Sequence, residues 1–234
     1  MREDYVKIGR EIVLRLLERY SDKIREEDFL AVYVSKDHKD LFTILIATIL
    51  TQNTSDKNAL KAFHNLMKKT NGRIDPENIL NMDISELEML VKPAGMYRRR
   101  AKTLINVARF FINEKKSIEK MILSRECEKL KEKLLEIEGV GEKTVDVVLL
   151  NIMSCPYFPV DTHIMRITRR LGLVDERAGY KEISSFWRSV VDEVYYLKLH
   201  LILIHHGRTI CRAIKPLCEK CVIKDLCRYR EKTG

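Results

Sequence analysis

The sequence predicts an all-α protein. Apolar residues recur at helical spacing along most of the 234-residue chain and make up 45% of it, enough for a globular core. The connections between the periodic stretches are short and carry glycine or proline, as in packed helices. Only "FLAVYV" at 29–34 has the composition of a strand. Because it has no second run to pair with, we expect it to be an isolated extended piece.

The expected helices follow one another closely. A first helix carries one apolar stripe, formed by Ile8, Ile12, Val13, Leu16 and Leu17. Further helical patterns cover about 41–51, 56–69, 97–113, 124–137, 143–154, 162–171 and 182–206. Two prolines in "SCPYFP" (154–159) stop one helix before the next begins, so we expect a boundary between two helical parts there.

Composition limits the class of protein. A formal charge of +9 and a pI of about 9.2 indicate a polyanionic partner such as nucleic acid. The first ten residues mix both signs of charge, unlike a signal peptide, and the longest apolar run (41–50) is too short to cross a bilayer. We therefore expect a soluble cytoplasmic protein, associated with the nucleoid and not with a membrane. Charged residues at 33% and a single glutamine are typical of archaeal or thermophilic proteins.

A glycine turn, Gly139-Val140-Gly141, lies between two helical patterns in "EIEGVGEKTVDVVLL" (136–150). A nucleotide-binding P-loop does not fit, because Glu142 separates the second glycine from the lysine and a helix, not a strand, precedes the turn. Glycines allow a tight helical hairpin, and the following helix N-terminus can hold a phosphate without reading bases. Thr144 belongs to the same expected phosphate contact. An ordinary helical corner remains equally open from the hairpin alone.

Lys143 lies in the first turn after the glycines, where the helix dipole disfavours a cation. The dipole and partial burial would lower its pKa and make a neutral, nucleophilic amine easier to form. The alternative is an exposed lysine that touches a phosphate. Asp161, in "PVDTHIMRITRRLGL" (159–173), precedes another helix, and Asp161 or Thr162 is an ordinary N-cap. If Asp161 meets Lys143, its carboxylate can accept a proton or stabilise positive charge on a sugar.

The C-terminal region carries a cysteine array with the spacing C-x6-C-x2-C-x5-C. Its members are Cys211, Cys218, Cys221 and Cys227. Such bunched thiolates indicate a metal site, and one C-x2-C pair with two single cysteines is closer to a [4Fe–4S] ligand set than to a zinc ribbon. Zinc remains the alternative. Basic residues between the ligands, Arg212 and Lys215 among them, could face a DNA phosphate, whereas Cys127 and Cys155 are expected to be plain buried thiols.

These features together resemble the endonuclease III family, the iron–sulfur branch of the helix–hairpin–helix DNA glycosylases. The resemblance rests on the hairpin with Lys143, on "VDTH" with Asp161 and on the cysteine array. It extends from about residue 37 to residue 232, including "LILIHHGRTICRAIKPLCEKCVIKDLCRYREK" around the array. It implies a six-helix domain at 36–155 and an iron–sulfur domain formed by 1–35 and 156–234, with DNA bound in the cleft between them.

The resemblance also implies an activity. A damaged base would be flipped out of double-stranded DNA, and a lysine at the position of Lys143 would attack C1′, form a Schiff base and cleave the abasic site by β-elimination. Asp161 matches the catalytic aspartate. Relatives that only remove the base usually lack this lysine, so the chain is expected to be a bifunctional, monomeric glycosylase and AP lyase for oxidised pyrimidines. A mismatch uracil or thymine glycosylase and a non-catalytic DNA-binding iron–sulfur protein are the alternatives.

Further DNA contacts are expected in two loops. In "LTQNTSDKNA" (50–59), either Gln52 or Asn53 corresponds to the residue that fills the gap left by the flipped base; a helix cap by Asn53, Thr54 or Ser55 is the alternative. In "KPAGMYRRRAKTL" (92–104), Met96 and Tyr97 are expected wedges against the orphan base. Arg98, Arg99 and Arg100 follow them and are expected to meet phosphates, although a solvated basic face explains at least one of the three. We expect His163, His205 and His206 to be structural.

Overall fold

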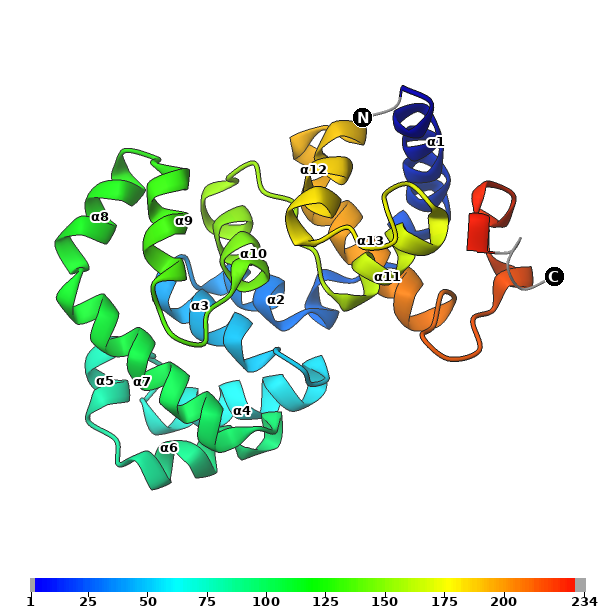
Figure 1. Ribbon diagram of the computed structural model, residues 1–234. Helices are drawn as coiled ribbons and strands as arrows, with labels where there is room; N and C mark the ends of the chain where they lie inside the picture. The colour runs from blue at the N-terminus through cyan, green and yellow to red at the C-terminus, as the bar shows by residue number, and fades with distance from the viewer. Residues whose placement is uncertain (1–2, 230–234) are drawn as a thin grey trace. The chain divides into compact units, whose positions relative to one another are not determined.

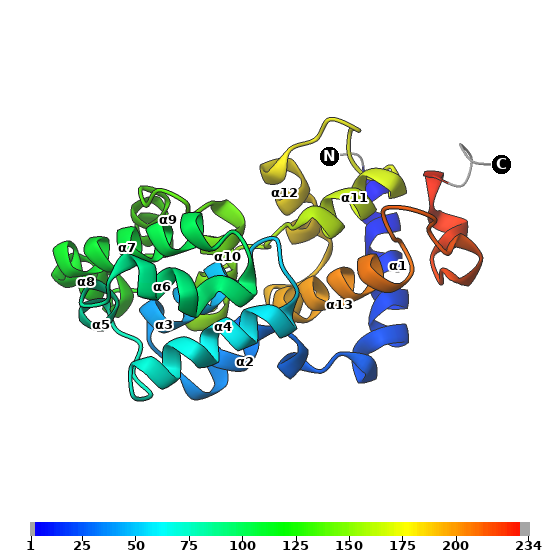
Figure 2. The same cartoon turned by 90° about the horizontal axis from the view of Figure 1, so that it is seen from below.

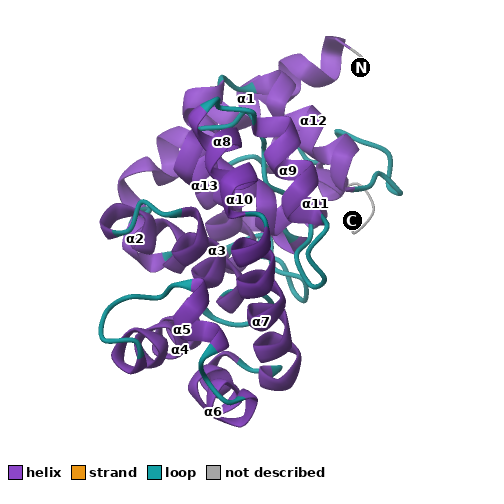
Figure 3. Cartoon of the chain, turned by 90° about the vertical axis from the view of Figure 1, so that its left-hand side faces the viewer, coloured by secondary structure: helices purple, strands orange, loops and turns teal. Residues whose placement is uncertain are grey.

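The computed structural model describes residues 3–229, and within that range it contains thirteen α-helices and no strand (Figure 1, Figure 3). The all-α prediction is confirmed. The helices are α1 (Glu3–Tyr20), α2 (Leu30–Asp37), α3 (Leu41–Leu50), α4 (Asp56–Lys69), α5 (Pro76–Leu80), α6 (Ile84–Val91), α7 (Tyr97–Asn113), α8 (Lys115–Leu123), α9 (Cys127–Leu135), α10 (Glu142–Met153), α11 (Thr162–Leu171), α12 (Tyr180–Val190) and α13 (Tyr196–Thr209). Short 3-10 helices span Ser21–Lys23, Glu26–Asp28, Lys92–Ala94, Glu193–Tyr195, Cys218–Lys220 and Lys224–Leu226.

The chain divides into two compact units. Unit 1 consists of Met1–Arg25 and Pro156–Gly234, and unit 2 of Glu26–Cys155. The second break in the chain coincides with the proline-bearing segment that follows α10. None of the helices in the described range is long and apolar enough to span a membrane.

Unit 2 is built around α3. Every residue of Leu41–Leu50 is buried, because α2, α4, α7 and α10 all pack against this helix. Asp40 begins it by accepting a hydrogen bond from the Thr43 N–H at 2.7 Å. A helix that is apolar on all sides belongs in a core, and α3 therefore fixes the positions of the amphipathic helices around it. Figure 1 shows it between α10 and α4.

Unit 1 is a smaller bundle of α1, α11, α12 and α13. The helix α1 packs against α12 and α13, and α11 packs against α13 (Figure 2). Gly9 allows the close approach of α1 to α12, since a Cβ there would lie 2.8 Å from Phe186 and from Val190. Trp187 is fully buried in the centre and donates its indole N–H to Thr168 at 2.8 Å. The segment after α13 carries the cysteine array.

Three sequence expectations differ from the structure. "FLAVYV" is not extended, because Leu30, Ala31, Val32 and Val34 are buried on the helix α2, and packing overrides their strand propensity. The helix expected over 182–206 is two helices, α12 and α13, because Val191 and Asp192 are extended. The short helices α5, α6 and α8 were not expected; α5 begins at a proline capped by Asp75.

Candidate functional site

The glycine turn is a helical hairpin that joins α9 to α10. Gly139 has a φ of +94°, and a Cβ on it would collide with Thr103 of α7. Gly141 is different: it is the N-cap of α10 with a φ of −112°, and a Cβ there would meet nothing within 4 Å. Packing therefore requires a glycine at position 139 only. The surface in front of Gly141 is open to a molecule that approaches the N-terminus of α10.

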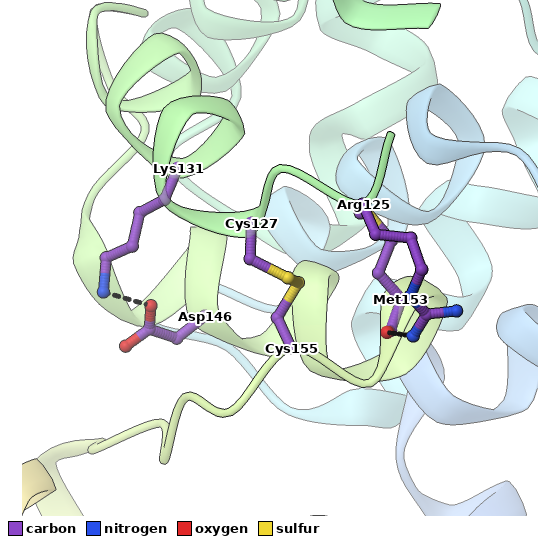
Figure 4. The surroundings of a disulfide bond; sticks show 6 residues. All are labelled: Arg125, Cys127, Lys131, Asp146, Met153 and Cys155. Atoms are coloured by element: carbon purple, nitrogen blue, oxygen red, sulfur yellow. Dashed lines mark hydrogen bonds and ion pairs between the residues drawn. A yellow bond between two sulfur atoms is a disulfide. The ribbon is translucent and has the colours of Figure 1, made fainter. Parts of the chain in front are cut away.

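Two links fasten the helices of this hairpin together (Figure 4). Cys127, at the start of α9, and Cys155, just after α10, form a disulfide with their Cα atoms 5.9 Å apart. The expectation that both are plain thiols is wrong, because the hairpin brings the two ends of the segment side by side. An ion pair of 2.6 Å joins Lys131 of α9 to Asp146 of α10, whose side chain is 1% exposed.

Lys143 is the second residue of α10 and is half-buried. It lies in the first turn of α10, next to the open surface at Gly141, as the sequence predicts. Val140 and Thr144 are buried beneath this turn. The Thr144 side chain accepts a hydrogen bond from the Gln52 amide at 3.1 Å, so its hydroxyl faces the protein and not a phosphate as we expected. Val140 likewise presents no side chain to a ligand.

Gln52 and Asn53 differ in their surroundings. The Gln52 side chain is half-buried and donates to the Gly139 carbonyl at 3.4 Å as well as to Thr144. Asn53 is exposed, with a left-handed backbone (φ +52°). Ser55 is the residue that caps α4, through the Asn58 N–H at 3.3 Å. Asn53 therefore takes no part in the helix cap and presents its amide outward, whereas Gln52 holds the loop to the hairpin.

The expected wedge residues begin α7. Met96 is the N-cap, is 48% exposed and has a φ of +47°. Tyr97 is half-buried, and its ring lies under Lys92 Nζ at 6.0 Å and Arg98 Cζ at 5.8 Å from the centroid. Arg98 is exposed. An apolar tip surrounded by basic groups thus lies at this end of α7.

Arg100 does not lie on that surface. Its side chain is buried, with the residue 4% exposed, and all its hydrogen bonds go to main-chain carbonyls. The expectation that it meets a phosphate is therefore wrong. Burial lowers the pKa of its guanidinium. Sequence reasoning could not separate it from Arg98 and Arg99, because only the packing of α7 onto α3 shows which of three consecutive arginines turns inward.

Asp161 is the N-cap of α11, in unit 1. Its Oδ1 accepts a hydrogen bond from the Ile164 N–H at 2.8 Å, and the residue is half-buried. The capping role that the sequence allowed is therefore present, and it fixes the orientation of the carboxylate. His163, two residues on, has its Nδ1 3.0 Å from the Arg166 guanidinium, and burial lowers its pKa. The structural interpretation of His163 is consistent with these contacts.

The four cysteines of the array line one pocket in unit 1. Its lining comprises Cys211, Cys218, Cys221, Cys227, Arg170, Ile210, Pro216, Lys224 and Tyr229. Within residues 3–229, no group of three or more His, Cys, Asp or Glu side chains has the geometry of a metal-ion site. The thiols surround a shared space, with two short 3-10 helices between them.

The array suits a positively charged metal group bound by thiolates. Burial, followed by the other three thiols, raises the pKa of Cys221 to about 11. Thiolates crowded in this way need positive charge among them, which a metal supplies. The Arg170 guanidinium lies 3.4 Å from Cys211 Sγ and 4.4 Å from the Tyr229 ring centroid. The chemistry of this donor set fits a thiolate-bound metal group.

His206 adds a contact that the sequence did not indicate. Its Nε2 lies 3.7 Å from Cys221 Sγ, and its Nδ1 lies 3.1 Å from the Tyr20 hydroxyl of α1. Burial lowers the pKa of His206 to about 4, so it is neutral near pH 7. No spacing pattern could have revealed His206 or Arg170, since both reach the array from other helices. Arg212 and Lys215 are exposed in the first cysteine loop, where Arg212 donates to the Lys215 carbonyl at 3.2 Å.

Comparison with known proteins agrees with these features. Residues 46–193 match the family model of the HhH-GPD superfamily base excision DNA repair proteins. Endonuclease III of Sulfolobus acidocaldarius is 39% identical over 222 residues, which are 95% of this chain and 96% of that protein.

Solved structures share the fold. The structure of a non-covalent endonuclease III–DNA complex has a TM-score of 0.80 at 23% identity, covering 100% of this chain and 99% of the other. The structure of a thermostable thymine-DNA glycosylase has a TM-score of 0.78 at 24% identity, covering 97% and 98%. At such identities the likeness supports the fold alone. The family match and the sequence identity establish more: the chain belongs to the endonuclease III family of the HhH-GPD superfamily and is an endonuclease III-like DNA glycosylase of base excision repair.

Proposed function

We propose that the protein excises oxidised pyrimidines from double-stranded DNA and cleaves the resulting abasic site, with Lys143 as the nucleophile. The observation that carries this proposal is a lysine in the first turn of α10, two residues after Gly141, whose surface is open. Neither core packing nor a helix dipole favours a cation in that place. A phosphate contact is the alternative role for this lysine, and the Lys143→Gln variant below separates it from a nucleophile.

The chemistry needs a neutral amine. Lys143 lies in the first turn of α10, where the helix dipole opposes a cation. Its Nζ would attack C1′ of the damaged nucleotide while the base departs with the glycosidic electron pair. Opening of the sugar gives a Schiff base, loss of a C2′ proton follows, and the 3′-phosphate leaves. Water then releases the amine.

Asp161 is proposed to stabilise positive charge on the sugar and to receive protons from the amine. The α11 cap occupies Oδ1 and holds the carboxylate in one orientation. This use of one oxygen leaves Oδ2 as the atom for catalysis. Asparagine is also a good N-cap, so Asp161→Asn removes the charge while it preserves the start of α11.

Duplex binding is proposed for the face of unit 2 that carries Gly141, Met96 and Arg98. The formal charge of +9 supports binding to a polyanion, and the N-terminus of α10 with no side chain at Gly141 suits a phosphate. Asn53 is proposed as the residue that fills the flipped-base gap, because its side chain is exposed whereas Gln52 is engaged with the hairpin.

A [4Fe–4S] cluster is proposed for the cavity lined by the four cysteines. The thiols surround the space, and the positive charge of Arg170 lies beside Cys211. When bound, the cluster would order the loops between the cysteines. Through those loops Arg212 and Lys215 would be held in place for DNA phosphates.

A lesion panel tests the proposed function. Duplexes with an oxidised pyrimidine, uracil or thymine opposite guanine, or an abasic site are incubated with the protein, and the product ends are identified. We expect oxidised pyrimidines to be released first and the strand to end in a β-elimination product. Lys143→Gln should abolish nicking, whereas Lys116→Gln, an exposed lysine on α8, should not change it.

Other results would contradict the proposal. Preferred release of mismatched uracil or thymine would support the alternative substrate class. Base release without nicking by the unaltered protein would contradict the proposed lyase activity. Nicking that persists in Lys143→Gln would mean that another residue is the nucleophile. Asp161→Asn should slow the reaction far more than it weakens DNA binding; equal losses would make Asp161 only a structural residue.

A further inference from the structure

Three loops of unit 2 carry the proposed contacts to DNA. The plug loop (51–55) contains Asn53, the wedge loop (92–97) contains Met96, and the hairpin loop (138–142) precedes Lys143. Buried side chains connect all three loops. The most extensive of these connections comes from Arg100, which lies one turn into α7.

Arg100 joins the plug loop to the wedge loop. Nη2 donates to the Gln52 carbonyl at 2.8 Å and to the Ala94 carbonyl at 3.1 Å, and Nε donates to the Gly95 carbonyl at 3.2 Å. Nη1 donates to the Ile49 carbonyl at the C-terminal end of α3. A cation at that end interacts favourably with the helix dipole. One planar guanidinium thus holds the last turn of α3 and both loops in a single geometry.

The hairpin loop is attached to the same group of residues. Gln52, whose carbonyl binds Arg100, donates its side-chain amide to the Gly139 carbonyl and to Thr144. Thr103, three residues after Arg100 on α7, lies against Gly139 so closely that no Cβ fits there. Arg100 therefore binds the plug loop and the wedge loop directly, whereas the hairpin loop is held by Gln52 and Thr103.

Both outer loops hold a residue in the left-handed backbone region. Asn53 and Met96 have φ values of +52° and +47°; this region costs methionine on the order of 1 kcal/mol, whereas asparagine adopts it more readily. Such conformations persist only where neighbouring contacts fix them. Two of the four carbonyls that Arg100 binds belong to Gln52, directly before Asn53, and to Gly95, directly before Met96. The hydrogen bonds are thus placed where they restrain these two residues.

We infer that Arg100 is a positioning residue that holds Asn53 and Met96 at a fixed separation for the two strands of a duplex. This inference rests on the proposed function, in which one residue fills the gap in the damaged strand and the other contacts the orphan base. Both tasks exist only where a complementary strand is present. Loss of Arg100 should therefore impair action on duplex DNA and spare the chemistry at Lys143.

The experiment compares an abasic site in duplex DNA with the same site in a single strand. Arg100→Met keeps much of the side-chain volume and removes the hydrogen bonds. We expect nicking of the duplex to fall about 10-fold to 100-fold, in keeping with the cost of small misplacements, while nicking of the single strand is unchanged. Arg109→Met is the matched control, since Arg109 is exposed on the same helix, is given no DNA contact and loses the same charge. It should affect both substrates alike.

A second variant covers the case in which Arg100→Met does not fold. Arg100→Lys keeps the charge but cannot bind four carbonyls. Its duplex activity should therefore lie between that of Arg100→Met and that of the unaltered protein. All rates are measured at a temperature where circular dichroism shows each variant to be folded. Equal losses on both substrates, or no loss on the duplex, would overturn the inference. If the unaltered protein nicks neither substrate, the proposed function itself fails.

Discussion

Gly139 and Gly141 are two residues apart and are glycines for different reasons. At Gly139 the backbone is left-handed and Thr103 occupies the space of a side chain. At Gly141 the backbone is ordinary and the space is empty. The first glycine is required by the fold, and the second leaves room for an external group. Serine substitutions can therefore separate the contribution of Gly139 to stability from that of Gly141 to DNA binding.

Gly139→Ser should lower the free energy of unfolding by more than about 1 kcal/mol, because serine strains at positive φ and collides with Thr103. Gly141→Ser should leave the free energy of unfolding unchanged or slightly raised, because serine is a good N-cap. It should nevertheless weaken duplex binding. Urea unfolding and DNA-binding titrations check both expectations. Unchanged DNA affinity in Gly141→Ser would show that no phosphate approaches this position.

Among single residues, the sequence indicated those whose chemistry is unusual for their place. Lys143 stands out because a cation opposes the helix dipole, and the cysteines stand out by spacing. Arg100 could not be recognised, since its role depends on carbonyls more than forty residues away along the chain, at Ile49 and Gln52. Local sequence contains no information on such partners.

The hairpin of α9 and α10 is held by a covalent bond and a buried ion pair. It is closed by the Cys127–Cys155 disulfide at its open end and by the Lys131–Asp146 ion pair along its length. The chain between the cysteines includes the whole hairpin and Lys143. Stability of this segment therefore bears directly on the proposed nucleophile.

The double variant Cys127→Ser/Cys155→Ser should be less stable than the unaltered protein. Closing a loop of this sequence separation removes chain entropy from the unfolded state, and the expected loss in free energy of unfolding is roughly 3–4 kcal/mol. Guanidinium unfolding followed by far-ultraviolet circular dichroism measures it. In the unaltered protein, thiol titration after non-reducing denaturation should find both cysteines unreactive. Identical unfolding midpoints would contradict a stabilising disulfide.

Prediction of helices succeeded where an apolar stripe is long and failed where packing decides. The stripe of α1 and the apolar run of α3 are visible in the sequence. The β-branched residues of α2 suggest a strand, and only their burial against α3 makes them helical. The disulfide was not predicted, because a reducing compartment was expected. Only the folded hairpin brings the two cysteines together.

On the scale of the whole molecule, the family match and the cysteine array cover different parts of the chain. The match to the HhH-GPD superfamily covers 46–193, which includes Lys143 and Asp161 and ends before the cysteine array. The array lies in unit 1 and its cavity is lined from α11 and the C-terminal loops. The proposed metal site is thus separate from the residues proposed for the chemistry.

The purified protein should be brown, absorb at roughly 400 nm and contain iron and sulfide in equal amounts. Cys221→Ser should lose the absorption and make the loops of residues 211–227 sensitive to protease, because the cluster orders them. The double serine variant of Cys127 and Cys155 is the matched control and should keep the colour. Stoichiometric zinc in a colourless protein would contradict the assignment.

The central claim is that the Lys143 amine forms a covalent bond to the sugar of a damaged nucleotide. Reduction with borohydride during reaction with abasic-site DNA would fix that bond, and mass spectrometry of the digested adduct would locate it. The account predicts a deoxyribose remnant on Lys143 and on no other amine. A remnant on a different lysine or on the N-terminal amine, or no covalent product with DNA that the protein cleaves, would contradict it.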